Sequence, residues 1–319
     1  MDNVDNSVDN LKNGRFYICK NKFGIRFATI VDYVDNRPEP ISTKGPVVGK
    51  TVDKGGTLML PVLFEFGPLS VYTWGLSLSL AILVGTIIAI RLARHVGIDS
   101  DTTLNLAIVL VIGGVVGARL FFVFVYEPAY FIENPLEIIA LWKGGMVYYG
   151  AFIGGFITGT WYVLAKKLPF WKLADVVAPP LALGYGIVRL GCFANGCCFG
   201  RHTDSFLGVI FPFLEGAPNI SDEFRYPTQL FSSALGFLLF VLLMFLWKKK
   251  KFDGQILLIF IILYSIGRSV VEYFRENLLV FGPVTVSQFV SALVIIPAVF
   301  FYWQRSRAGG TGVNGPGAK

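Results

Sequence analysis

The stretch from Gly184 to Arg201 reads G-Y-G-I-V-R-L-G-C-F-A-N-G-C-C-F-G-R and decides how the chain is interpreted. It combines residues that a bilayer tolerates poorly, two arginines, an asparagine and three cysteines, with five glycines that permit close backbone approach. Together with the preceding Pro179-Pro180 pair, it predicts a short or broken helix that runs into irregular backbone. Such backbone persists at membrane depth only when it is buried or lines a wet cavity. The stretch indicates a functional site; the alternative is a packed helix end with an arginine reaching the lipid surface.

The composition is that of an integral membrane protein. The 319 residues are 54% hydrophobic and 15% charged, with a mean hydropathy of +0.61. Soluble domains carry about 25% charged residues. The net charge of +7 does not indicate nucleic-acid binding, because the basic residues fall in small clusters at the ends of apolar runs.

Apolar runs long enough to cross about 30 Å of hydrocarbon predict an all-α membrane domain with about seven transmembrane helices over residues 63–307. The expected spans are Leu69–Ile90, Leu104–Tyr126, Val147–Ala165, Leu173–Leu190, Gln229–Trp247, Gln255–Phe274 and Val284–Trp303.

The two ends of the chain differ from this domain. Residues 1–62 form a polar extension without a recognisable targeting pattern, and its alternating segment Phe23–Tyr33 is consistent with either a small β unit or a disordered tail. Residues 308–319 are predicted to form a flexible tail from their glycine-rich composition.

Basic clusters predict the orientation of the spans. They follow the first, third, fifth and seventh spans and alternate with acidic or mixed loops. By the positive-inside rule, the N-terminus lies outside and the C-terminus in the cytoplasm. The clusters are Arg91, Arg94 and His95; Lys166, Lys167 and Lys172; Lys248 to Lys251; and Arg305 with Arg307.

Three arginines lie in or at the edge of predicted spans: Arg119, Arg189 and Arg268. An arginine at a helix centre costs roughly 2.5 to 3.5 kcal/mol on insertion scales, so each needs a partner. Glu272 follows Arg268 by one helical turn and can pair with it. For Arg119 and Arg189, an anionic ligand such as a lipid phosphate would satisfy the guanidinium; the alternative is bonding to backbone carbonyls.

The chain resembles the bacterial prolipoprotein diacylglyceryl transferases from Phe66 to about Ile296. The resemblance implies a seven-helix enzyme of the bacterial inner membrane, with its N-terminus outside. It rests on seven stretches in order: F-G-P-L-S-V-Y-T-W-G, G-G-V-V-G-A-R-L, W-K-G-G-M-V-Y-Y-G-A-F-I-G-G, G-I-V-R-L-G-C-F-A-N-G-C-C-F-G-R, R-Y-P-T-Q-L-F, G-R-S-V-V-E-Y-F-R-E and V-S-Q-F-V-S.

The resemblance implies transfer of the diacylglyceryl group of phosphatidylglycerol to the lipobox cysteine of a preprolipoprotein, without a cofactor. A thiolate would displace a phosphate ester, which requires positive charge at the phosphate and an acceptor for the thiol proton. By analogy, Arg189 and Arg268 handle the phosphate. The other implied family positions are Arg119, Asn195, Gly200, Tyr264 and Glu272.

Several positions depart from the family pattern. Tyr149 stands where the family usually has a histidine, and it is a poor base because the free phenol has a pKa of about 10. Glu272 therefore remains as a proton acceptor, with Tyr149 as a second catalytic candidate. Neither His95 nor His202 matches a catalytic position. The further departures are Trp74, Cys192, Cys197, Tyr226 and Ser232.

The cysteine pattern C-x4-C-C formed by Cys192, Cys197 and Cys198 leaves several interpretations open. It lacks the C-x2-C spacing of zinc sites, so no metal is expected. The thiols could accept an acyl or alkyl group, form a disulfide, or be buried and inert. Two competing functions follow: a lipid-binding or transport protein without catalysis, and a membrane thiol oxidoreductase that uses these cysteines.

Overall fold

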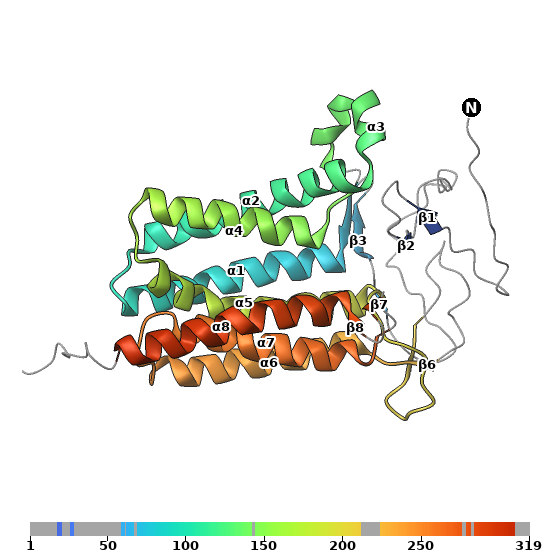
Figure 1. The fold of residues 1–319 in the computed structure, drawn as a ribbon. Coiled ribbons are helices and arrows are strands. Elements are labelled where there is room, and N and C mark those ends of the chain that lie inside the picture. The colour runs from blue at the N-terminus through green and yellow to red at the C-terminus, as the bar shows by residue number, and fades with distance from the viewer. Residues whose placement is uncertain are drawn as a thin grey trace, which may run out of the picture.

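The computed structural model describes residues 18–20, 26–28, 59–60, 62–66, 69–141, 144–211, 224–275, 279–281 and 284–309. Within these ranges the chain forms a bundle of long helices (Figure 1). The long helices are α1 (Thr73–His95), α2 (Ser100–Phe121), α4 (Tyr148–Ala165), α5 (Phe170–Ala194), α6 (Thr228–Trp247), α7 (Gln255–Glu272) and α8 (Val286–Gly309).

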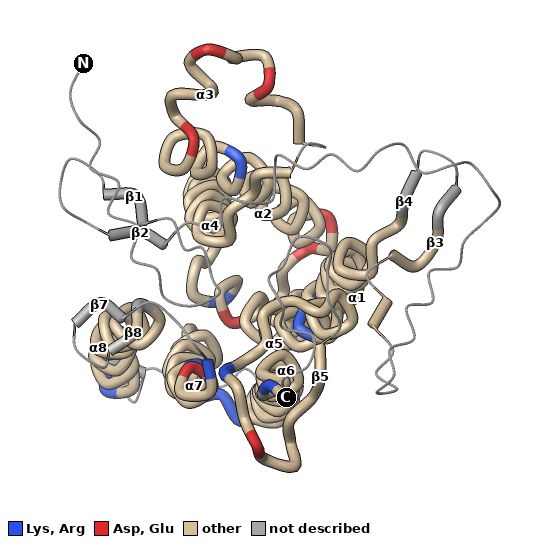
Figure 2. The backbone as a smooth tube through the Cα atoms, turned by 90° about the vertical axis from the view of Figure 1, so that its right-hand side faces the viewer, with Lys and Arg blue, Asp and Glu red and all other residues tan. Residues whose placement is uncertain are grey.

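These helices confirm the predicted all-α integral membrane protein. Among the described residues, six helical segments are long and apolar enough to cross a membrane. The remaining long helix, α4, carries four glycines and lies along α2 (Figure 2). Figure 2 also shows α5, α6 and α7 gathered in another part of the bundle. The α2–α4 pair thus lies apart from the helices that hold the central stretch.

Glycines explain why α2 and α4 approach so closely. A Cβ atom added at Gly117 would lie 2.4 Å from the carbonyl oxygen of Gly150, and one at Gly154 would lie 2.3 Å from that of Gly113. Small residues at such positions let two backbones touch within a membrane. Close packing at small residues therefore explains the approach of α2 to α4.

One end of the bundle carries the short irregular elements (Figure 1). A π-helical turn, Phe122–Tyr126, extends α2 and is followed by α3 (Pro128–Glu133) and a 3-10 turn, Pro135–Ile139. The antiparallel hairpins are β1 (Ile18–Lys20) with β2 (Arg26–Ala28), β3 (Val62–Phe66) with β4 (Leu69–Tyr72), β5 (Val209–Ile210) with β6 (Phe224–Arg225), and β7 (Leu279–Phe281) with β8 (Val284–Thr285).

Most of the predicted extension, residues 1–62, and of the predicted tail, residues 308–319, lies outside the described residues. The first predicted span began too early, because residues 69–72 pair with β3 as strand β4 before α1 begins. At the other end, α8 continues to Gly309 and so takes in the first residues assigned to the tail.

The prediction of a helix broken near Pro179-Pro180 is wrong. Helix α5 continues through both prolines to Ala194, and irregular backbone begins only at Asn195. In a membrane bundle, neighbouring helices can accommodate a proline within a helix. Here Pro180 faces Gly85 of α1, where a side chain would come within 3.6 Å of the proline ring.

The opposite end of the bundle carries the basic clusters, at the ends of α1, α4, α6 and α8. A buried carboxylate orders this end: Asp175 of α5 is 3.4 Å from the Lys250 ammonium and accepts hydrogen bonds from the backbone N–H groups of Gly254 and Leu257. Asp175 therefore pairs with a lysine that follows the end of α6. The grouping of the four clusters is the arrangement on which the predicted orientation depends.

Candidate functional site

The central stretch ends in a loop that α6 and α7 hold in place. Gln229 donates a hydrogen bond of 2.6 Å to the Cys197 carbonyl, and Thr228 donates one of 2.9 Å to the Cys198 carbonyl. Both donors are fully buried. Gly200 donates its N–H to Tyr226, and a Cβ atom there would lie 2.4 Å from the Phe274 carbonyl oxygen. Glycine at position 200 therefore positions the loop against α7.

The predicted ion pair on α7 is present. The Arg268 guanidinium lies 2.5 Å from a Glu272 carboxylate oxygen and donates a second bond, of 3.1 Å, to the Ser287 hydroxyl of α8. Glu272 is only 2% exposed. The carboxylate thus holds one side of Arg268 and has little contact with the exterior.

Arg189 has different surroundings. Its guanidinium stacks 5.1 Å from the centre of the Tyr185 ring, one turn earlier on α5. Within the part of the chain that the structure describes, no hydrogen bond or ion pair to this guanidinium is present. The Tyr185 ring meets the Tyr264 ring edge to face, with 5.2 Å between ring centres. Arg189 is therefore a cation whose polar N–H groups remain available.

Tyr148 and Tyr264 connect the two arginines. The two side chains interact with each other, and the charges of Arg189 and Arg268 act on both tyrosines. Tyr148 lies beside Tyr264, Arg189 and Arg268 and is nevertheless 69% exposed. The site that these residues form is therefore open to the surroundings. The predicted residues Arg189, Arg268, Glu272 and Tyr264 thus belong to one cluster.

Tyr149, the residue predicted from the family histidine, takes a different position. Its ring packs against that of Tyr148, with 6.0 Å between ring centres, and it is 48% exposed. Successive residues of a helix point about 100° apart, so only one of the two can face Tyr264 directly. The structure gives this position to Tyr148.

Of the two alternatives for Arg119, the structure shows bonding to backbone carbonyls rather than an unsatisfied guanidinium. Its guanidinium donates to the backbone carbonyls of Glu137, Ile138 and Gly144 at 2.6 to 2.8 Å and to that of Gly145 at 3.2 Å. Arg119 is 5% exposed and also stacks on two phenylalanine rings. This was the alternative in which carbonyl groups satisfy an intramembrane arginine. Arg119 joins α2 to the loop before α4.

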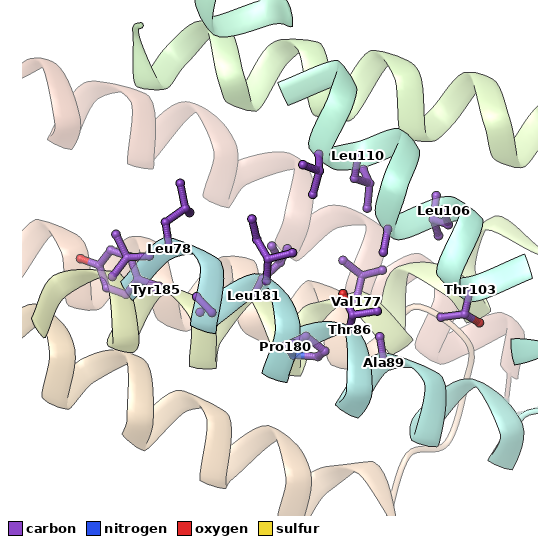
Figure 3. Close-up of a pocket in the computed structure, with 17 residues that line it drawn as sticks. Leu78, Thr86, Ala89, Thr103, Leu106, Leu110, Val177, Pro180, Leu181 and Tyr185 are labelled. Carbon is purple, nitrogen blue, oxygen red and sulfur yellow. The ribbon is translucent and has the colours of Figure 1, made fainter. Parts of the chain in front are cut away.

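An apolar cavity of about 270 Å³ lies between α1, α2 and α5 (Figure 3). Its walls are almost entirely aliphatic, and it extends from Thr103 along the bundle to Tyr185 and Val188. Because Arg189 stacks on Tyr185, whose side chain lines one end of the cavity, the cation lies near that end. A hydrocarbon chain and an attached phosphate could occupy the cavity and the cation together.

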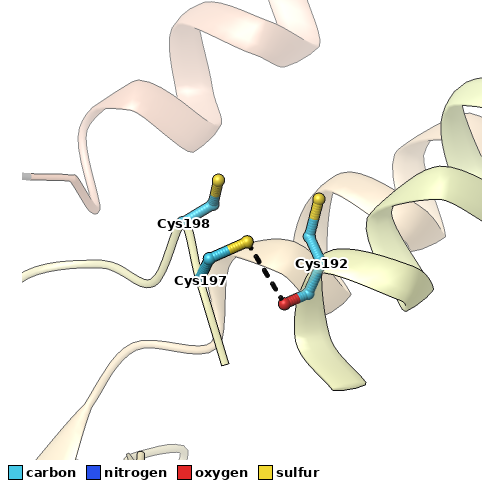
Figure 4. Close-up of side chains that lie close together, drawn as sticks. All are labelled: Cys192, Cys197 and Cys198. Carbon is cyan, nitrogen blue, oxygen red and sulfur yellow. Dashed lines mark hydrogen bonds between the residues drawn. The ribbon is translucent and has the colours of Figure 1, made fainter. Parts of the chain in front are cut away.

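The three cysteines of the central stretch lie together (Figure 4), with all three sulfur atoms within 4.8 Å of one another. Cys192 is buried, whereas Cys198 is exposed. Hydrogen bonds from Cys192 and Cys197, together with the charges of Arg189 and Arg275, lower the pKa of Cys198. Asn195, one of the implied family positions, directly follows α5, and its side chain interacts with the Cys197 thiol. Asn195 is therefore adjacent to the thiols.

Comparison with known proteins settles the family. Residues 61–304 match the prolipoprotein diacylglyceryl transferase family. The chain belongs to this family. A relative from Clostridium tetani named phosphatidylglycerol–prolipoprotein diacylglyceryl transferase is 36% identical over 247 residues, which cover 76% of this chain and 97% of the relative. Proteins of the same name from Nostoc sp. (35% identical; 72% and 84% covered) and Bacillus cytotoxicus (34%; 78% and 93%) are similar over comparable lengths.

Within this family member, the sequence analysis missed three residues of the cluster: Tyr148, Tyr185 and Arg275. Tyr185 lies four residues before Arg189 on one helix face, and Arg275 lies seven residues after Arg268. Spacings of four and seven residues place side chains on the same helix face, so both residues could have been found from the sequence. The buried Nε atom of Arg275 has no hydrogen-bond partner among the described residues. The position of Tyr148 had no such signal.

Proposed function

We propose that this protein transfers the diacylglyceryl group of phosphatidylglycerol to a prolipoprotein cysteine. Family membership and the shared name of the relatives support this enzymatic activity. One observation in the structure supports it most directly: the guanidinium of Arg189 is unpaired within the described residues and lies at the end of a cavity suited to hydrocarbon. A phospholipid presents the matching pair of groups, an anionic phosphate joined to acyl chains.

In this proposal, Arg189 binds the phosphate that becomes the leaving group. A planar guanidinium can hold two phosphate oxygens and stabilise the charge that develops on them. Arg268 contributes a second positive charge from α7, and Tyr148 with Tyr264 orients the phosphate between the two helices. An acyl chain occupies the cavity that ends at Tyr185 and Val188.

Glu272 is assigned the role of positioning Arg268. It is buried, it faces the guanidinium, and it lies on the same helix one turn away. The predicted role of Glu272 as acceptor of the thiol proton has no support from this arrangement, because the carboxylate is directed at the cation. Tyr149 is likewise placed beside the cluster rather than at its centre.

We further propose that the acceptor is the lipobox cysteine and that the protein is a multi-pass component of the bacterial inner membrane. The irregular end of the bundle, opposite the basic clusters, contains the cysteine loop. If the basic end faces the cytoplasm, the reacting groups lie toward the outer surface. An exported prolipoprotein arrives at that surface.

Mass spectrometry of a lipobox peptide incubated with purified protein and phosphatidylglycerol tests the proposal. We expect a mass increase of one diacylglyceryl group on the cysteine, and none on a matched peptide with serine in its place. Lipid retention without peptide modification, under conditions in which a relative is active, would instead indicate the lipid-binding alternative. No observation favours the oxidoreductase.

A further inference from the structure

The three thiols of Cys192, Cys197 and Cys198 are not used by the lipid-binding cluster, yet they converge on one point. Their sulfur atoms lie within 4.8 Å of one another. Sulfur atoms bound to one zinc ion at about 2.3 Å would lie about 3.8 Å apart, so small side-chain rotations would close the site. The sequence spacing had argued against zinc, but the folded loop brings the ligands together.

The loop backbone makes this convergence possible. Gly196 and Cys198 both adopt left-handed conformations, with φ of 71° and 68°. Cysteine rarely adopts positive φ, and adjacent side chains in extended backbone point in opposite directions. Here the two turns let both Cys197 and Cys198 approach Cys192 at the end of α5 (Figure 4).

Partners outside the thiol cluster hold the loop rigid. The buried side chains of Thr228 and Gln229 fix the carbonyls of Cys198 and Cys197, and Cys197 also contacts the Cys192 carbonyl through its sulfur, at 3.7 Å. Metal sites depend on such outer contacts to orient their ligands. These two hydrogen bonds fix the backbone of the dipeptide that carries two of the three thiols.

The charge around the thiols suits a bound metal. A divalent ion with three thiolates has a net charge of −1, and a fourth thiolate makes it −2. The positive charges of Arg189 and Arg275 both act at Cys198. Glu272 is the carboxylate whose charge acts on Arg275, and it is already paired with Arg268.

We propose that Cys192, Cys197 and Cys198 bind a zinc ion whose open fourth position takes the acceptor thiol of the peptide substrate. The metal site stands on the thiol geometry alone, whereas its role with the peptide rests on the proposed transferase function. Catalytic zinc sites typically combine three protein ligands with one open position. A thiol that coordinates zinc is deprotonated, which supplies the function of the missing family histidine.

The reaction balances as follows. The peptide S–H releases its proton to water as its sulfur binds zinc. That sulfur then forms a bond to the terminal glyceryl carbon, while the bond from this carbon to the phosphate oxygen breaks. The electron pair leaves with glycerol phosphate, whose added charge faces Arg189. The thioether product is neutral and dissociates from the metal.

Metal binding to the full-length protein in detergent is the first test. The protein is reduced, stripped with a chelator, and titrated with Zn²⁺ against a chromophoric competitor. We expect one zinc ion per chain and, in Cys192→Ser or Cys198→Ser, a loss of affinity of more than about 100-fold, above the effect of losing an outer contact. Cys19→Ser is the matched control, because Cys19 belongs to β1, and it should bind zinc normally.

Cobalt replaces zinc in the second test and reports the ligands directly. A near-ultraviolet sulfur-to-cobalt band is expected, and a lipobox peptide should intensify it whereas the serine peptide should not. Thermal unfolding of each serine variant shows whether it is folded. Binding of Cu⁺ but not Zn²⁺, a disulfide between two of the three thiols in anaerobically purified protein, or unchanged zinc affinity in folded Cys198→Ser would overturn the proposal.

Activity separates this inference from the proposed function. Full transfer by protein that contains no zinc would overturn the metal's role and leave the transferase proposal intact. A cobalt band that responds to the peptide thiol, without any transfer to it, would support the metal site and contradict the transferase proposal.

Discussion

Arg119 and Arg189 are both arginines in membrane helices, but their surroundings are opposite. Four backbone carbonyls accept from Arg119, whereas Arg189 has only an aromatic stacking partner among the described residues. Burying a charge is tolerable only when its hydrogen-bonding groups are satisfied. Arg119 of α2 is satisfied by the protein itself, whereas for Arg189 of α5 we propose that a ligand has this role.

The largest expected effect follows from replacing the unpaired cation. Arg189→Ala should lower kcat by on the order of a thousandfold, because positive charge at the leaving phosphate is lost in a water-poor site. Its thermal stability should be close to that of the unmutated protein, since only the stacking contact with Tyr185 is lost. Steady-state transfer to a lipobox peptide and thermal unfolding measure the two quantities. Near-normal turnover would remove the distinction between the arginines.

Arg119→Ala should show the opposite result, a loss of stability of about 3 kcal/mol, because the backbone carbonyls that accept from Arg119 lose their donor. Equilibrium unfolding in mixed micelles measures this loss. Arg91→Ala is the matched control: Arg91 is exposed at the end of α1, and its removal should change stability by less than about 0.5 kcal/mol. A stable but inactive Arg119→Ala would instead place this arginine among the substrate-binding groups.

Gly117→Ala tests the close packing of α2 against α4. The added methyl group would lie 2.4 Å from the Gly150 carbonyl oxygen, so α2 and α4 must separate at a cost of about 2 kcal/mol. Gly75→Ala on α1 meets no atom within 4 Å and should be neutral or slightly stabilising. Comparing the two unfolding free energies separates close packing from helix propensity; equal values would refute the packing argument.

The smallest expected effect distinguishes the neighbouring tyrosines. Tyr148→Phe removes the hydroxyl that we propose orients the phosphate and should lower kcat about tenfold, equivalent to one hydrogen bond. Tyr149→Phe should change kcat by less than about twofold. The same peptide assay measures both variants. A larger effect at Tyr149 would favour the position inferred from the family histidine.

The sequence predicted the helices well, because long apolar runs have few alternatives in a membrane. It also predicted the ion pair of Arg268 with Glu272, since their spacing matches one helical turn. Predictions failed where backbone atoms decide the outcome. The carbonyl groups that satisfy Arg119 occur in every residue and leave no mark in the sequence.

Other features depended on details that spacing does not encode. The choice between Tyr148 and Tyr149 is set by the rotation of α4 at its first turn. The meeting of the three thiols requires two positive φ angles, one of them at a cysteine, where sequence does not suggest it. The spacing of the C-x4-C-C pattern therefore argued against a metal site, although the fold brings the three sulfur atoms together.

The buried Asp175 has a consequence for how the protein is made. Its partners Lys250, Gly254 and Leu257 lie 75, 79 and 82 residues further along the chain. At roughly 5 to 20 residues per second, a ribosome needs about 4 to 16 seconds to supply them. During that interval the Asp175 carboxylate lacks these three partners. We therefore expect α5 to pack fully against the other helices only after α6 and the start of α7 have been synthesised.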